Sequence, residues 1–183
     1  MNRDEWEEAV SSCDRCGSNR CSKPLVPTYI EDAKVWIQFS TPGRLEIESG
    51  REWTKSLIGK VLPHYLWYLG VNPEEVYITF SAFSRKSEFK EYSVIDRCRY
   101  WKKDEFSHLS NIKAVVLLGN DAFRQSWGSS APSVVRISGS IFRLDGDKKG
   151  LVVMHPGFLQ RNPSKRKDVY AALQRLGRQC GFK

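Results

Sequence analysis

One uninterrupted apolar segment constrains the fold of this chain more than any other feature. Residues 114–118 read AVVLL, a run typical of a strand that is buried on both faces of a sheet. A second short apolar run, at 151–154, is bounded by glycine and proline and also predicts a buried strand. Further strands are predicted at 34–39 and 75–81. Predicted helices alternate with these strands along the chain. This order predicts one three-layer α/β/α domain with a mainly parallel, four-stranded central sheet.

The whole chain, 1–183, is expected to form a single domain, with an N-terminal cysteine-containing segment at 11–24. Helices are predicted at about 4–10, 55–69, 93–109, 120–127 and 165–178, where apolar residues recur at helical spacing or turn signals bound the segment. The segment 134–144 is predicted to form a hairpin around Gly139.

The chain is basic, with 29 Lys+Arg against 21 Asp+Glu and a net charge of +8. This excess indicates a polyanionic partner, of which nucleic acid is the commonest. A basic surface without such a partner, on a domain that binds protein, is the alternative. No run approaches the roughly 20 apolar residues of a membrane helix, and the acidic N-terminus lacks an apolar signal core. We therefore expect a monomeric cytoplasmic protein that does not bind membranes.

Two candidate functional positions follow predicted strands directly. The turn Ser40-Thr41-Pro42-Gly43 comes after the strand at 34–39, and His155 comes after the strand at 151–154. In open α/β sheets, ligands bind outside the carboxyl ends of the strands. Ser40 and His155 are therefore expected to face one cleft.

Two segments mix aromatic or apolar residues with cations, as nucleic-acid contacts require. The first, at 81–90, contains Arg85 and Lys86. The second, at 155–167, is predicted to be a loop whose apolar tip enters a base stack while its cations hold phosphates. Its candidate residues are Phe158, Leu159, Gln160, Arg161, Lys165, Arg166 and Lys167. The alternative is a turn followed by the solvated start of a helix.

The cysteines indicate a metal centre. Cys13 and Cys16 have the C-x-x-C spacing that presents two thiolates to one metal, and Cys21 follows closely. In an intracellular chain, five cysteines suit a metal, a cluster or unligated thiols better than disulfides.

Several segments together resemble the family 4 uracil-DNA glycosylases, the type that carries an iron–sulfur cluster. The matching segments follow one another in order over nearly the whole chain: Cys13-x-x-Cys16, Thr41-Pro42-Gly43, GREW at 50–53, GVNPEEVYIT at 70–79, VVLLGNDAF at 115–123 and MHPGFLQRNPS at 154–164. The resemblance implies a domain that flips a base out of single- or double-stranded DNA into a pocket, where its glycosidic bond becomes accessible. It assigns His155 the stabilisation of the departing base.

The resemblance also exposes departures in the catalytic motifs. Ser40 stands where the family has its water-activating carboxylate, with Phe39 in place of the preceding glycine. Phe80 stands in place of the asparagine that reads uracil, and Trp53 replaces a stacking phenylalanine. A serine hydroxyl is no general base without a partner, and a phenylalanine ring has no hydrogen-bonding group to read a base edge.

The cluster ligands are also incomplete by this resemblance. Cys98 matches the fourth cysteine of the family, whereas Ser84 occupies the position of the third. We expect a [4Fe–4S] cluster held by Cys13, Cys16 and Cys98. Cys21 is the first candidate for the remaining ligand, and Cys180 is a weaker one. A zinc site, or no metal, is the alternative.

The sequence thus predicts DNA-base recognition, with excision of a base other than or in addition to plain uracil. The expected catalytic residues are His155 and Ser40, and the expected base pocket consists of Phe39, Thr41, Pro42, Gly43, Trp53 and Phe80. The alternative is a DNA-binding homologue with weak or no catalysis.

Overall fold

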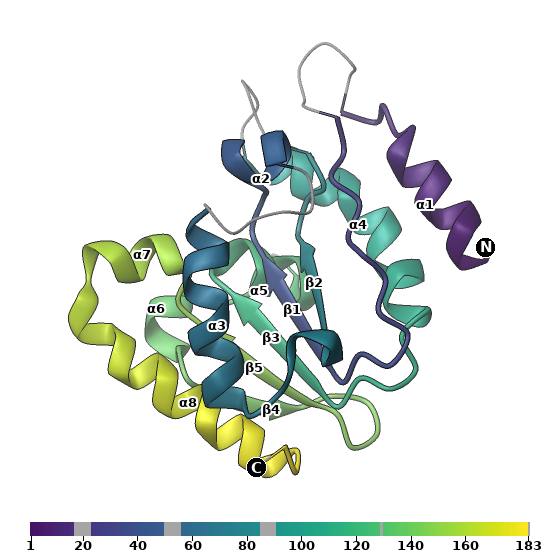
Figure 1. Cartoon of the computed structure of the whole chain (residues 1–183). Helices are drawn as coiled ribbons and strands as arrows, with labels where there is room; N and C mark the ends of the chain where they lie inside the picture. The colour runs from purple at the N-terminus through teal and green to yellow at the C-terminus, as the bar shows by residue number, and fades with distance from the viewer. Residues whose placement is uncertain (17–22, 50–55, 85–90, 129, 183) are drawn as a thin grey trace.

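The computed structural model describes residues 1–16, 23–49, 56–84, 91–128 and 130–182. Its centre is a five-stranded sheet in the order β2-β1-β3-β5-β4 (Figure 1). The strands are β1 (Val35–Phe39), β2 (Val76–Phe80), β3 (Ala114–Leu118), β4 (Ile141–Arg143) and β5 (Lys149–Val153). The four predicted strands correspond to β1, β2, β3 and β5, which pair in parallel.

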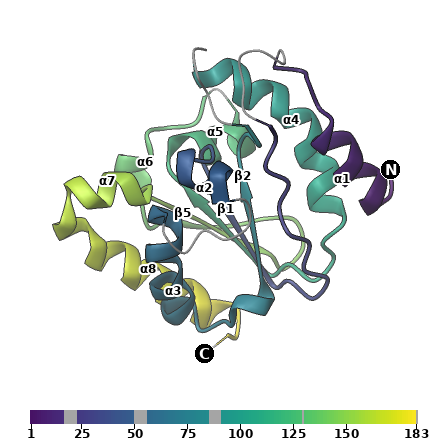
Figure 2. The ribbon, with the colours of Figure 1, turned by 45° about the horizontal axis from the view of Figure 1, so that its top comes forward.

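Helices cover both faces of the sheet, which confirms the predicted α/β architecture (Figures 1 and 2). Helices α3 (Leu57–Leu69) and α8 (Arg166–Gln179) pack together on one face. Helices α4 (Glu91–Ser107) and α5 (Asn120–Trp127) pack together on the other, and α1 (Arg3–Ser11) lies against α4. The short helices are α2 (Arg44–Ser49), α6 (Val134–Ile137) and α7 (Pro156–Arg161), with 3₁₀ turns at Pro73–Glu75 and Pro163–Lys165.

The strand residues are buried because helices lie on both sides of them. Every residue of β1 and β3 is buried, including the amide side chain of Gln38. That amide donates hydrogen bonds to Ser81 Oγ (3.1 Å) and Gln125 Oε1 (2.6 Å). The polar group in the strand is therefore satisfied inside the core, as a buried amide requires.

The hairpin predicted at 134–144 is wrong in its first half. Residues 134–137 form the short helix α6, and β4 pairs antiparallel with β5 rather than with them. Gly139 adopts a φ of 91°, and its N–H donates to Val152 O (2.8 Å). The positive φ lets the chain turn at once from α6 onto the sheet edge, so no first arm forms.

Among the described residues, no helix is both long and apolar enough to cross a membrane.

The packing of α3 on α8 depends on the absence of a side chain at Gly177. A Cβ at this position would lie 2.1 Å from the backbone oxygen of Leu69 in α3. Alanine normally favours a helix over glycine, but a main-chain carbonyl cannot rotate away as a side chain could. Gly177→Ala is expected to lower the free energy of unfolding by about 1–3 kcal/mol, the cost of overpacking a close-packed site.

Urea denaturation of Gly177→Ala beside Gln179→Ala checks this expectation. Gln179 is an exposed residue near the end of the same helix, so its replacement should change stability by less than about 0.5 kcal/mol. A Gly177→Ala protein as stable as the wild type would show that the two helices can separate without loss.

Candidate functional site

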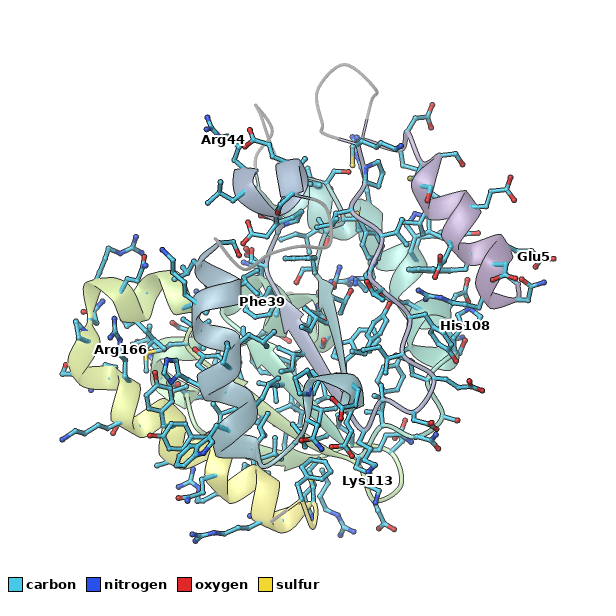
Figure 3. The ribbon with its side chains drawn as sticks, viewed as in Figure 1. Glu5, Phe39, Arg44, His108, Lys113 and Arg166 are labelled. Atoms are coloured by element: carbon cyan, nitrogen blue, oxygen red, sulfur yellow. The ribbon has the colours of Figure 1, made fainter. Side chains whose placement is uncertain are left out.

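Three parallel strands deliver the candidate site residues to one edge of the sheet. Ser40 follows β1, the turn at Gly119 precedes α5 after β3, and His155 follows β5. The ring of Phe39, the last residue of β1, lies edge-on to the His155 imidazole with centroids 6.3 Å apart. Figure 3 labels Phe39 at this end of β1. Ser40 and His155 therefore share the edge where ligands of open α/β sheets bind.

The imidazole of His155 is held by the start of the helix that follows it. His155 is the N-cap of α7, and its Nδ1 accepts a hydrogen bond from the Gly157 N–H (3.1 Å). Pro156 occupies the first helical position, where its missing N–H costs nothing. Since Nδ1 accepts, the neutral ring carries its proton on Nε2, which is then a hydrogen-bond donor.

Burial lowers the pKa of His155, while the carboxylates of Asp121 and Glu46 raise it and Arg161 lowers it further. The net shift is downward, so the ring is mainly neutral at neutral pH. The close approach of the β3–α5 turn contributes to this burial. A Cβ on Gly119, whose φ is 90°, would lie 2.9 Å from His155 Cβ, so both the conformation and the space require glycine there.

Ser40 has a carboxylate partner that the sequence did not predict. Its Oγ donates a hydrogen bond to Oδ2 of Asp121, which lies in the first turn of α5. The main chain of Ser40 is also fixed, because its carbonyl oxygen accepts from the Ser81 N–H (2.7 Å). The available signal was the position of Asp121, just after another parallel strand whose end lies at the same edge.

A second carboxylate, Glu46, lies close to this edge. Glu46 is in α2 and has a side chain that is nearly fully buried. Its Oε2 lies 2.5 Å from the position that a Cβ on Gly43 would occupy, so the end of this carboxylate lies directly against the turn at Gly43. The site thus contains one neutral imidazole and two acidic side chains.

The residues predicted to form the base pocket are divided between core and surface. Phe39 and Phe80 have no exposed area, and their ring centroids lie 6.2 Å apart in the core. Both rings therefore support the site from below and do not form its open wall. Thr41 and Gly43 are half-buried and Pro42 is buried. Trp53 lies outside the described residues.

The predicted loop at 155–167 is mostly helical. His155 and Pro156 provide an N-cap and a first helical residue, so α7 begins immediately and is followed by the turn Pro163–Lys165 and by α8. Leu159 is buried in the core, which is incompatible with an exposed inserting tip in this conformation. Phe158 is half-buried against the core. Gln160, Arg161, Lys165, Arg166 and Lys167 are exposed. Arg85 and Lys86 lie outside the described residues.

A small cavity of about 220 Å³ lies between α3, α7 and α8, and three of the side chains that line it are basic. Lys60 and His64 come from α3, and Arg166, labelled in Figure 3, comes from the start of α8. Tyr65 also lines it, and the buried Tyr65 hydroxyl has no hydrogen-bond partner among the described residues. Cations from two helices facing one hollow suit a bound anion such as a phosphate.

Three of the predicted metal ligands share one apolar cluster, apart from the main core. Cys16 and Cys98 are buried in it with Trp6, and Cys13 packs against it. The indole N–H of Trp101, in the same cluster, has no hydrogen-bond partner among the described residues. Such a donor suits a nearby thiolate or sulfide acceptor.

The ligand set is nevertheless incomplete in the part of the chain that the structure describes. Within those residues, no three Cys, His, Asp or Glu side chains converge as a metal site. Cys21 lies outside them. Cys180 packs against the other core cluster, with its Sγ 3.8 Å from Lys113 O, so it does not join the three cysteines. The cysteines fit a metal centre in residue type and grouping, but the described geometry does not close one.

The model of the uracil DNA glycosylase superfamily matches residues 27–176 of this chain. The matched region includes every strand of the sheet, Ser40, Asp121 and His155. The N-terminal helix and the C-x-x-C pair precede it. No curated protein matches the chain. The match covers most of the 183 residues, and the fold agrees with it, so the chain belongs to the uracil DNA glycosylase superfamily.

Proposed function

We propose that this protein is a DNA glycosylase that hydrolyses the N-glycosidic bond of a base other than, or in addition to, plain uracil. One observation carries the proposal: the Nε2 donor of His155 and the Ser40–Asp121 pair lie at the same edge of the sheet. Hydrolysis needs a donor for the leaving base and an oriented water for the sugar. This edge offers a candidate for each.

His155 is the proposed stabiliser of the leaving base. Breaking the glycosidic bond leaves negative charge on the base, and a preorganised donor at a base oxygen lowers that barrier. The hydrogen bond from Gly157 fixes the ring orientation and the tautomer, so Nε2 needs little reorganisation at the moment of reaction. Ser40, half-buried after the end of β1, is the proposed group that aligns the water.

The altered specificity follows from Phe80. An amide that pairs with a base edge rejects other bases, because they leave its polar groups unpaired. Phe80 has no such group, and its ring is fully buried below the site. Plain uracil is therefore expected to gain no selective hydrogen bonds from this position.

DNA contact is proposed for the basic surface around α7 and the start of α8. Arg161, Lys165, Arg166 and Lys167 are exposed there, and Lys60 and His64 face the adjoining cavity. Phosphate contacts of this kind supply affinity without reading sequence. Phe158 and Gln160, rather than the buried Leu159, are the proposed residues next to the bases.

The second candidate function is DNA binding with weak or no catalysis. Serine at position 40 and phenylalanine at position 80 favour it, because each replaces a group that family 4 enzymes use. An excision assay that measures whether the base is released from the DNA distinguishes the two functions.

A metal centre held by Cys13, Cys16 and Cys98 is also proposed, with Cys21 as the candidate for a further ligand. Thiolates suit an iron–sulfur cluster, and zinc is the alternative. A cluster there would tie the N-terminal segment to α4, because Cys98 belongs to that helix. No step of the proposed reaction passes through it.

The excision test uses oligonucleotides that each carry one altered base: uracil, hydroxymethyluracil or hypoxanthine, in single- and double-stranded form. The wild type should release uracil slowly and at least one other base faster. His155→Ala should lower that faster rate by roughly 10²-fold or more, because it removes the donor to the leaving base. His108→Ala is the matched control. Efficient uracil release by the wild type would contradict the specificity, and tight binding without any release would favour the second function.

The DNA-contact test replaces Lys165, Arg166 and Lys167 with alanine. Affinity should fall for every sequence, and the slope of log Kd against log salt should flatten by about one for each lost phosphate contact. The control replaces Lys113, Arg143 and Lys148 with alanine. It removes the same amount of charge, but near the ends of β3 and β5 that lie away from the candidate site. Equal losses in both triple variants would indicate a general charge effect instead of a defined surface.

The metal test is elemental analysis of anaerobically purified protein. Iron and acid-labile sulfide should be present, and Cys98→Ser should lower both, because it removes one thiolate. Cys180→Ser should retain them, since Cys180 packs in a different cluster. Zinc in place of iron would support the alternative, and neither metal would leave ordinary thiols.

A further inference from the structure

The carboxylate of Asp121 is fixed against the hydroxyl of Ser40. The two residues are 81 positions apart in the chain, and they meet because β1 and β3 are neighbouring parallel strands. Both side chains are half-buried, so the pair lies at the accessible edge of the sheet and not deep in the core. Because Oγ gives its one proton to Asp121, its lone pairs remain available to accept a hydrogen bond from a third group.

The same carboxylate also acts on His155. Among the charged groups around that imidazole, Asp121 has the largest effect and raises its pKa. Gly119, two residues earlier, brings the β3–α5 turn against the Cβ of His155. The ends of three strands thus gather an acid, a hydroxyl and an imidazole around one position.

We propose that Asp121 supplies the carboxylate that position 40 lacks: Ser40 orients the attacking water, and Asp121 receives the proton that this water releases. The inference rests on the proposed glycosidic hydrolysis and completes its water side. Asp121 acts through Ser40 and is therefore a positioning residue that also accepts a proton. Ser40 is the residue that touches the water.

In the proposed hydrolysis, each bond that forms is matched by one that breaks, and Ser40 is never ionised. The water oxygen bonds to the sugar C1′, and the C1′–N bond breaks with its electron pair left on the base, whose oxygen accepts from His155 Nε2. The water proton passes to Ser40 Oγ as the proton of Ser40 passes to Asp121 Oδ2. Ser40 ends neutral and Asp121 ends protonated. Exchange with solvent then returns the proton from Asp121 and neutralises the released base.

Glu46 is the competing carboxylate. It is nearly fully buried and also raises the pKa of His155, but less than Asp121 does. Its Oε2 faces the turn at Gly43, whereas Asp121 hydrogen-bonds to Ser40 itself. The direct hydrogen bond favours Asp121, and Glu46→Gln provides the comparison within the same site.

The test measures kcat and KM on the oligonucleotide whose altered base the wild type releases fastest. Asp121→Asn should lower kcat by roughly 10²-fold or more, the usual contribution of a general base, and leave KM unchanged. Ser40→Ala removes the same hydrogen bond from the other side and should lower kcat similarly. The double variant should be no slower than the slower single variant, because the two residues act as one unit. Asp4→Asn, in the exposed first turn of α1, is the matched control and should behave as wild type.

A rescue variant separates proton acceptance from a merely structural role. Ser40→Glu in the Asp121→Asn background moves the carboxylate to position 40 and should recover part of the lost kcat. Ser40→Glu alone should be slower than this double variant, because two adjacent carboxylates disfavour each other's ionised form. Loss of a structural contact would not be repaired by moving the charge.

The outcomes distinguish this inference from the proposed function. If the wild type releases a base and either Asp121→Asn or Ser40→Ala has the same kcat as the wild type, the inference is wrong while the proposed function stands. A lower kcat for Glu46→Gln together with an unchanged kcat for Asp121→Asn leads to the same conclusion. If the wild type binds DNA but releases no base from any oligonucleotide, the proposed hydrolysis is itself wrong, and the role of Asp121 falls with it.

Discussion

The alignment of parallel strand ends is the constraint on which the rest of the site depends. Phe39 of β1 lies opposite Phe80 of β2, and Leu118 of β3 lies opposite Val153 of β5. Main-chain hydrogen bonds continue past the strands, from Gly119 N–H to Val153 O (2.9 Å) and from Ser81 N–H to Phe39 O (2.8 Å). Because a ladder of hydrogen bonds fixes this register, the strands end together at one edge of the sheet, and the turns that carry the site residues begin there.

The sequence predicted the sheet well because its strands are buried on both faces. A strand between two helical layers must be apolar throughout, and the runs at 114–118 and 151–154 show this directly. The edge strand β4 was harder to place, since its three residues are only partly covered and carry little pattern. The segment at 155–167 was misread as a loop because proline and glycine usually mark turns. After an N-capping histidine, proline instead begins a helix.

The sequence could predict the positions of Ser40 and His155 in the site, but not that of Asp121. Ser40 and His155 follow their strands at once, so position in the chain was enough to place them at one edge. Asp121 lies inside α5, and the turn at Gly119, with its positive φ, decides which side of the helix faces the site. The φ angle of Gly119 cannot be read from any periodic pattern in the sequence. The burial of Phe80 likewise depends on its packing against Phe39, a contact between two strands.

The close crossing of α3 and α8 has a consequence for recognition. Gly177 lets the main chains of the two helices approach closely near Leu69, so the helices form one closely packed unit. Lys60 and His64 project from one member of this unit and Arg166 from the other, into the same cavity. The distance between these basic side chains is therefore set by the crossing of the two helices. In the proposed DNA contact, that fixed distance would match one spacing of phosphates along a strand, a property set by sugar pucker and not by the identity of the bases.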